Sequence, residues 1–189
     1  MPGRLDGKRI AILATDGFEQ AELFTPKDEL TKAGAAVEIV SPKSGQIQGF
    51  EHFDKGRSAE VDKTLEQANP ADYDALVLPG GAHNPDNLRI DDKALSFVRA
   101  FFEAGKPAGV ICHAPWILIN AGLAKGRTLT SYKTIREDLK NAGANVVDKE
   151  VVVDRGLVTS RQPDDLPAFC AKLIEEIAEG KHRGQAHAA

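Results

Sequence analysis

Short runs of consecutive apolar residues alternate along the chain with longer segments whose apolar residues recur at helical spacing. The runs are typical of strands that a sheet buries on both faces, and we expect such strands at residues 9–14, 36–40, 75–78, 108–111 and 157–159. The periodic segments predict helices over residues 22–33, 91–104, 116–121, 135–141 and 166–177. Because strands and helices alternate, the pattern indicates an α/β protein with a mainly parallel central sheet covered by helices on both sides.

Three segments fall outside this alternation. Residues 45–60 are polar and punctuated by glycines, so we expect a surface hairpin rather than part of the main sheet. Residues 145–160 contain strand-like runs separated by an Asp154-Arg155-Gly156 turn, and residues 181–189 indicate a loose tail. No internal repeat or interdomain linker is evident, and residues 1–189 are predicted to form a single domain.

Composition narrows the classes of function. The 189 residues have a formal net charge of -4 at pH 7 and no run of Lys or Arg, so there is no nucleic-acid signature. The apolar runs are far shorter than the roughly 18 to 20 residues that span a bilayer, and the polar N-terminus lacks the apolar centre of a secretory signal. Two cysteines are too few for a disulfide framework, and they provide too few soft ligands for a structural zinc site. We therefore expect a cytoplasmic protein without membrane, metal or cofactor; no nucleotide-binding glycine motif is present.

The candidate chemistry centres on Cys112. The apolar run Ala108–Ile111 leads directly into Cys112 and His113, and Pro115 can open the next helix. At such a turn, unpaired backbone N–H groups and the helix dipole favour thiolate, which predicts a pKa of roughly 4 to 7 instead of ~8.5. The alternative is a buried apolar cysteine, as we expect for Cys170 on its helical stripe. The preceding strand, the adjacent histidine and the proline favour the reactive interpretation.

Two further loops are expected at the same edge of the sheet, because they also follow buried strands. In the first, Glu19 could project toward the thiol or be a solvated acid in the first turn of a helix, and spacing alone does not decide between these. In the second, Pro79-Gly80-Gly81 offers backbone N–H groups without side chains, as an oxyanion-binding edge requires. A plain turn that ends the strand gives the same pattern.

Six motifs occur in order along the chain: Asp16-Gly17-Phe18-Glu19, Ala75-Leu76-Val77-Leu78-Pro79-Gly80-Gly81, Ile111-Cys112-His113 with Pro115, Thr130-Ser131-Tyr132, Glu150-Val151-Val152-Val153-Asp154 and Thr159-Ser160-Arg161-Gln162-Pro163-Asp164-Asp165-Leu166-Pro167. Together they resemble the ThiJ/PfpI superfamily, specifically its PfpI-like branch of intracellular proteases, general stress proteins and deglycases. The resemblance covers nearly everything from Lys8 to Ile177. It implies one flavodoxin-like, class I glutamine amidotransferase-like domain, a three-layer sandwich with the cysteine on a strained nucleophile elbow.

The resemblance also implies roles for individual residues. Cys112 matches the nucleophile, and Glu19 matches the carboxyl group that hydrogen-bonds the thiolate. Gly81, next to Gly80, and the backbone of His113 match the oxyanion-hole donors. In PfpI-like oligomers the matching histidine is paired with an acid from a neighbouring subunit.

Asp86 lies near the position that matches this acid. His83, in the same loop, is expected to be a surface histidine. The residue after Cys112 and His113 departs from the family pattern, because Ala114 replaces the usual glycine beside the substrate. Its methyl group would crowd the turn or the approach of the substrate if the backbone needs a positive φ there. Trp116 is bulkier than expected, and we interpret it as packing between helix and sheet.

The activities implied by the resemblance are peptide hydrolysis and cofactor-independent glyoxalase or deglycase chemistry on reactive carbonyls. Partners would be a small carbonyl or a peptide or protein substrate, and further copies of the chain in a homodimer or hexamer. We favour carbonyl substrates, because the compact chain has no obvious peptide-binding insertion. A different class of function is a redox sensor, in which Cys112 is oxidised and protection is exerted through partners.

Overall fold

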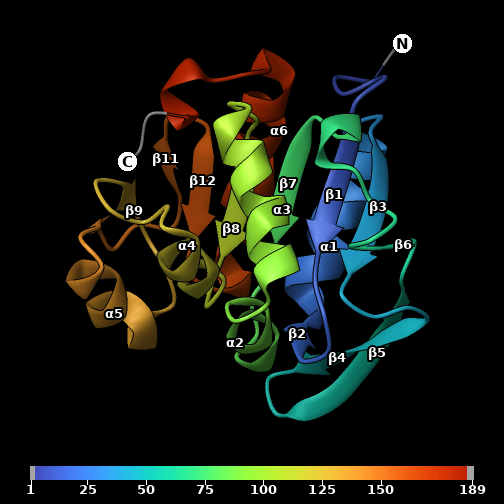
Figure 1. Cartoon of the computed structure of the whole chain (residues 1–189), viewed down its shortest axis with the longest axis horizontal. Coiled ribbons are helices and arrows are strands. Elements are labelled where there is room, and N and C mark those ends of the chain that lie inside the picture. The colour runs from blue at the N-terminus through green and yellow to red at the C-terminus, as the bar shows by residue number, and fades with distance from the viewer. Residues whose placement is uncertain (1–2, 187–189) are drawn as a thin grey trace.

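A seven-stranded sheet lies at the centre of the computed structural model, which describes residues 3–186 (Figure 1). The strand order is β11-β12-β8-β7-β1-β3-β6, and every neighbouring pair is parallel except β11 and β12. The strands are β1 (Arg9–Leu13), β3 (Ala36–Ser41), β6 (Lys63–Thr64), β7 (Ala75–Leu78), β8 (Ala108–Ile111), β11 (Val152–Asp154) and β12 (Leu157–Ser160). The predicted, mainly parallel sheet is confirmed.

The order of the main strands determines at which edge of the sheet a site can form. Taken in chain order, β1, β3, β7, β8 and β12 lie in the sequence 2-1-3-4-5, which is the flavodoxin-like order. The direction of winding reverses between β1 and β7, so the loops at their carboxyl ends diverge and leave room for a site. The loop after β8 emerges beside them, because Val110 pairs with Leu78.

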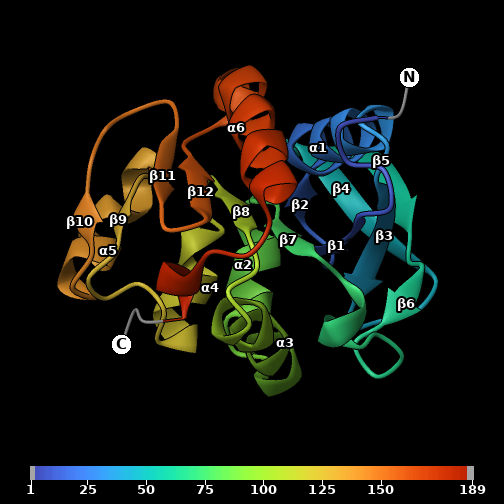
Figure 2. The ribbon, with the colours of Figure 1, turned by 90° about the horizontal axis from the view of Figure 1, so that it is seen from above.

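Helices cover both faces of the sheet, as predicted (Figure 2). Helices α1 (Gln20–Lys32) and α6 (Leu166–Glu179) cover one face, and α3 (Asp92–Glu103) and α4 (Pro115–Ala121) cover the other. Successive residues of β1 contribute to separate cores: Ile10 and Ile12 pack with α1 and α6, and Ala11 and Leu13 with α3 and α4. No helix within residues 3–186 is long and apolar enough to cross a membrane.

Smaller elements complete the fold. The predicted hairpin is present as β4 (Gln46–Glu51) and β5 (Asp54–Glu60), which pair in antiparallel fashion, and β2 (Phe18–Glu19) joins them alongside β4. The others are β9 (Thr128–Leu129), β10 (Asn145–Val146), α2 (His83–Leu88), α5 (Arg136–Asn141) and the 3-10 turns η1 (Pro70–Asp72), η2 (Lys133–Ile135), η3 (Pro163–Asp165) and η4 (Arg183–Gln185).

Helix α1 begins earlier than the sequence predicts. Glu19 is extended (φ -73, ψ 119) because it belongs to β2, and the helix starts at Gln20 rather than Glu22. Pro26 consequently lies inside the helix, where its ring nitrogen cannot donate to the carbonyl of Glu22. Glu22 is thereby placed in the first turn of α1 and is completely buried.

The prediction of a loose tail is wrong for residues 181–186, while residues 187–189 lie outside the described part of the chain. Gln185 is 1% exposed, and its side-chain amide donates to the carbonyl of Lys106 at 3.1 Å. The buried guanidinium of Arg127 donates to the carbonyl of Gln185 at 2.7 Å. These long-range bonds dock the segment, and a polar sequence pattern does not reveal them.

Truncating the chain after Gly180 is expected to lower the free energy of unfolding by about 3 kcal/mol, because it leaves the buried Arg127 without one of its acceptors. Urea denaturation measures this change. The matched control is a chain that ends at Ala186, which keeps the docked residues. Equal stability of the two truncated chains would contradict the docking role.

Candidate active site

Cys112 occupies a strained turn between β8 and α4. Its φ of 65° is in the left-handed region, which non-glycine residues rarely adopt. The turn is held on both sides, because the Cys112 N–H donates to the Ser160 carbonyl at 3.1 Å and its carbonyl accepts from Tyr132 N–H at 2.8 Å. Pro115 opens α4 as expected. Strand, sharp turn and helix thus form the predicted elbow, and Cys112 is 6% exposed.

The carboxyl group at the sulfur belongs to Glu22. Glu22 is completely buried beside Cys112, and its Oε2 accepts from Gly80 N–H at 2.8 Å, while its Oε1 has no hydrogen-bond partner among the described residues. Space there is so limited that a Cβ on Gly80 would lie 2.5 Å from Glu22 Oε2 and 2.6 Å from Cys112 Cβ. Close approach of strand, helix and elbow therefore requires glycine at position 80.

Glu19 does not make the bond to sulfur that the sequence analysis assigned to it. Its Oε2 accepts instead from the backbone N–H of His52, at the tip of the hairpin, at 3.1 Å. The physical reason is the early start of α1, which places Glu19 in β2 and turns Glu22 toward the elbow. Glu19 still acts on the site electrostatically, because its charge raises the pKa of Glu22.

Burial dominates the protonation of the pair. It raises the pKa of Glu22 to about 8, with the Gly80 N–H opposing the shift. Burial, followed by the charge of Glu22, also raises the pKa of the Cys112 thiol, and the N–H groups of Gly81 and His113 oppose this. The lowered thiol pKa expected from the helix dipole alone is therefore wrong. Below pH 8 the Glu22 carboxyl is mostly protonated, so it carries little charge that would oppose ionisation of the sulfur.

His113 adjoins the sulfur from the solvent side. Its Nδ1 lies 3.1 Å from Cys112 Sγ, and its Nε2 lies 3.3 Å from Thr134 Oγ1. The imidazole stacks on Tyr132 with ring centroids 4.7 Å apart, and Trp116 meets it edge-on at 5.3 Å. Burial lowers the pKa of His113, so the neutral imidazole, which can accept a proton, predominates at pH 7.

Tyr132 and Thr134 are contacts that sequence reasoning did not assign. Tyr132 belongs to the Thr130-Ser131-Tyr132 motif, and this motif could have indicated a contact with the site. No feature of the sequence indicated such a contact for Thr134. Trp116, interpreted as a packing residue, does pack on the core at α4, and its Nε1 donates to Asp138 at 2.8 Å.

Two of the three predicted oxyanion or substrate contacts have backbone N–H groups that already donate within the protein. Gly80 N–H is already bonded to Glu22, so it is not available to an oxyanion. Ala114 is fully buried, and its N–H donates to the Ile111 carbonyl at 3.1 Å. Because Ala114 is helical (φ -59, ψ -27), its methyl group causes none of the crowding that a positive φ would bring. Gly81, where φ is 82°, lies beside the elbow, and its N–H lowers the pKa of the Cys112 thiol against the effect of burial.

Asp86 lies apart from the pair formed by Cys112 and His113 within one chain. It is exposed in α2, as is His83, and neither makes a hydrogen bond to the thiol or the imidazole. A contribution of Asp86 across an interface stays a prediction.

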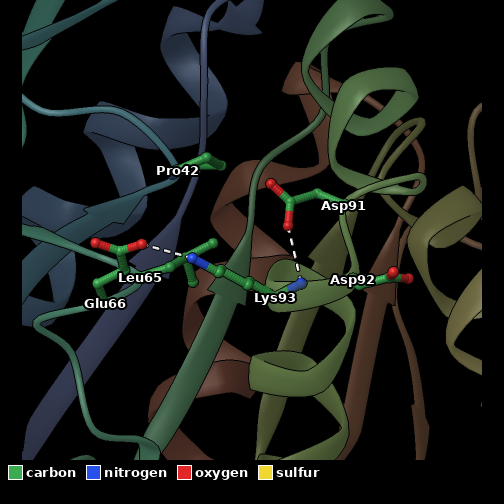
Figure 3. Close-up of a pocket in the computed structure, with 6 residues that line it drawn as sticks. All are labelled: Pro42, Leu65, Glu66, Asp91, Asp92 and Lys93. Atoms are coloured by element: carbon green, nitrogen blue, oxygen red, sulfur yellow. Dashed lines mark hydrogen bonds and ion pairs between the residues drawn. The ribbon is translucent and has the colours of Figure 1, made fainter.

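The second cysteine, Cys170, is 4% exposed in the core beneath α6, which confirms its packing role. Both cysteines are free. A surface hollow of about 370 Å³ lies elsewhere, between the end of β3 and the start of α3 (Figure 3). Its lining residues are Pro42, Leu65, Glu66, Asp91, Asp92 and Lys93, none of which belongs to the elbow.

A cysteine on a strained strand-to-helix turn, with a buried carboxyl, an imidazole and backbone N–H groups around the sulfur, defines a flavodoxin-like protein with a nucleophile elbow. The sequence matches the DJ-1/PfpI family over residues 8–176. The chain belongs to this family.

Relatives in the family carry several functional names. The chain is 49% identical over 167 residues to Protein/nucleic acid deglycase 2 of Escherichia coli, covering 86% of this chain and 93% of that protein. It is 44% identical to Deglycase PfpI of Pyrococcus furiosus (88% and 98% covered) and to "Putative cysteine protease YraA" of Bacillus subtilis (86% and 94% covered).

Solved structures agree with the fold. The DJ-1/ThiJ/PfpI-like part of a two-domain Anabaena variabilis protein is similar with a TM-score of 0.85 and 33% identity, covering 90% of this chain and 48% of that one. Drosophila melanogaster DJ-1beta is similar with a TM-score of 0.83 and 28% identity, covering 95% and 93%. The relatives' names support an enzyme of DJ-1/PfpI type.

Proposed function

We propose that the chain is a cofactor-independent enzyme that uses the Cys112 thiolate on reactive carbonyls, with glyoxalase or deglycase activity. The observation that carries the proposal is the contact of His113 Nδ1 with the Cys112 sulfur at 3.1 Å, on a strained elbow (φ 65°) that lies beside the buried carboxyl of Glu22. The deglycase names of relatives support the same class of substrate.

In the first step, the neutral imidazole of His113 accepts the thiol proton at Nδ1, 3.1 Å from Sγ. The sulfur then forms a bond to the aldehyde carbon, and the carbonyl π electrons move onto oxygen. The N–H groups of Gly81 and His113 stabilise this oxyanion, and a donor of this kind typically contributes ~3 kcal/mol. Protonation of the oxyanion gives a hemithioacetal.

The second step is an internal proton shift. For methylglyoxal, a base removes the proton from the former aldehyde carbon and returns one to the neighbouring carbon, which converts the hemithioacetal to a thioester. His113 and Glu19 are the candidate proton carriers, since burial raises the pKa of Glu19 and its carboxyl neighbours Glu22. Water then cleaves the thioester, releasing a hydroxy acid and regenerating the thiol.

Peptide hydrolysis is the second candidate, favoured by the protease name of the Bacillus subtilis relative. A redox-sensor role for Cys112 stays a prediction, and so do the cytoplasmic location and the homodimer or hexamer. The buried Cys170 in α6 offers no resolving thiol at the elbow.

Methylglyoxal and a fluorogenic peptide, offered separately, distinguish the two enzymatic candidates. We expect consumption of methylglyoxal with lactate as product, and peptide cleavage at the background level of Cys112→Ala. Peptide cleavage without lactate formation would favour the protease. If neither rate exceeds that of Cys112→Ala, the proposed enzyme activity is wrong.

A further inference from the structure

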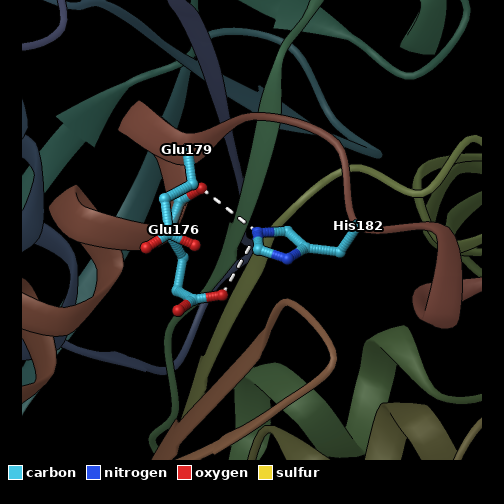
Figure 4. Close-up of side chains that lie close together, drawn as sticks. All are labelled: Glu176, Glu179 and His182. Atoms are coloured by element: carbon cyan, nitrogen blue, oxygen red, sulfur yellow. Dashed lines mark hydrogen bonds and ion pairs between the residues drawn. The ribbon is translucent and has the colours of Figure 1, made fainter.

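Three potential metal ligands converge at the end of the molecule opposite Cys112. They are Glu176 and Glu179, in the last turn of α6, and His182, in the segment that follows (Figure 4). One ligand atom from each lies within 4.8 Å of the others. The cluster adjoins Gly105 and Gly156, which precede β8 and β12, so it belongs to the amino-terminal edge of the sheet.

The histidine is held in place by the fold. Gly180 ends α6 with a φ of 93°, and the chain then folds back so that His182 N–H donates to the Gly105 carbonyl at 2.7 Å. The imidazole fills the space above Gly156, where a Cβ would lie 2.8 Å from His182 Cδ2. Its Nε2 consequently faces Glu176 Oε2 at 3.2 Å.

The cluster gathers two carboxylates around one imidazole. Glu176 is 9% exposed, and a buried carboxylate needs a compensating charge. Among residues 3–186, its carboxylate has only His182 as an ion-pair partner, since Lys172 pairs with Glu175 at 2.9 Å. Glu179 adds a second carboxylate, and the carboxyl end of α6 adds a partial negative charge.

We propose that Glu176, Glu179 and His182 bind a divalent transition-metal ion of the zinc type. One imidazole nitrogen and two carboxylate oxygens suit Zn²⁺, which binds them at about 2.0 to 2.2 Å. Ligand atoms at these lengths lie at most about 4.4 Å apart, so the exposed side chain of Glu179 closes the remaining gap. Water completes the coordination. The ion replaces the contact between His182 and Glu176 and links α6 to the docked segment.

The sequence analysis expected no metal because it considered cysteine ligands. This site uses none, and its spacing (176, 179, 182) spans a helix end that the sequence pattern does not fix.

Calorimetric titration of Zn²⁺ into the full chain tests the proposal, with every protein carrying Cys112→Ala so that the active-site thiol cannot bind the ion. We expect about one Zn²⁺ per chain, no binding at this site in His182→Ala, and affinity at least about tenfold lower in Glu179→Gln. Because Glu179 is exposed, Glu179→Gln keeps the fold even if His182→Ala does not. Zn²⁺ should also raise the Tm of the unsubstituted cluster.

Two matched controls define specificity. Glu175→Gln removes a neighbouring carboxylate of α6 that lies outside the cluster, and His83→Ala removes an exposed histidine of α2. Both should bind Zn²⁺ like the parent. The proposal is overturned if the parent binds no Zn²⁺, if Glu179→Gln binds it as tightly as the parent, or if Glu175→Gln weakens binding equally.

Discussion

Cys112→Ala is expected to lower kcat/KM for methylglyoxal by at least ~1000-fold, because no other side chain at the elbow can form the covalent bond to the carbonyl carbon. The backbone N–H groups of Gly81 and His113 remain in the variant. A small residual rate from substrate binding is therefore compatible with the mechanism. Lactate formation under steady-state conditions measures the loss.

The matched control is Cys170→Ala, which removes the other buried thiol from beneath α6. It should retain kcat/KM within about twofold while losing some stability, because it opens a small cavity in the core. Comparable activity losses in the two variants, with both folded by circular dichroism, would contradict a specific role for Cys112.

Glu22→Gln is expected to lower kcat by about 100-fold and to change the pH dependence of the reaction. The wild-type carboxyl, with a pKa raised to about 8 by burial, is mostly uncharged below that pH and does not oppose ionisation of the sulfur. Above it, the carboxylate loses the proton, and its charge raises the pKa of Cys112. Wild-type activity should therefore fall as pH rises through about 8. The amide of the variant does not titrate, so this alkaline decline should disappear.

At alkaline pH the Glu22→Gln substitution should raise stability while it lowers activity. The pKa of Glu22 is higher in the folded chain than the ordinary 4.5, so its contribution to stability is present below pH 4.5 and is lost as pH rises through about 8. At pH 9 the Glu22→Gln variant should therefore have a Tm at least about 3 °C above the wild type.

Glu19→Gln serves as the comparison for this variant, because Glu19 bonds to His52 rather than to the sulfur and its charge raises the pKa of Glu22. Removing the charge of Glu19 lowers the pKa of Glu22, which should move the alkaline decline to lower pH without abolishing it. Loss of the decline in Glu19→Gln and its retention in Glu22→Gln would reverse the two assignments.

Buried strands were the most predictable part of the fold. The apolar runs at β1, β3, β7, β8 and β12 are buried on both faces, and such burial leaves a direct trace in sequence. Helix α2 could not be predicted from the sequence, because His83–Leu88 is short and polar and contains Pro85. The docking of Gln185 was equally hidden, since it depends on carbonyl and guanidinium partners far away in the chain.

In the site, the elbow at Cys112 could be predicted because strand, thiol, histidine and proline are contiguous. The choice between Glu19 and Glu22 could not, because it depends on where α1 begins. That start is set by the pairing of Glu19 with Phe50 in the hairpin, a tertiary contact. The raised pKa of Cys112 was missed for a related reason: depth of burial outweighs the helix dipole, and local sequence does not report depth.

The hydrogen bond from Cys112 N–H to the Ser160 carbonyl has a consequence for biosynthesis. Cys112 leaves the ribosome well before β12 does, and β8 acquires this neighbour only after residues 157–160 have emerged. A nascent or prematurely terminated chain that stops before Ser160 carries the thiol in an unconstrained peptide. The constrained elbow at Cys112 therefore forms only after residues 157–160 have been synthesised.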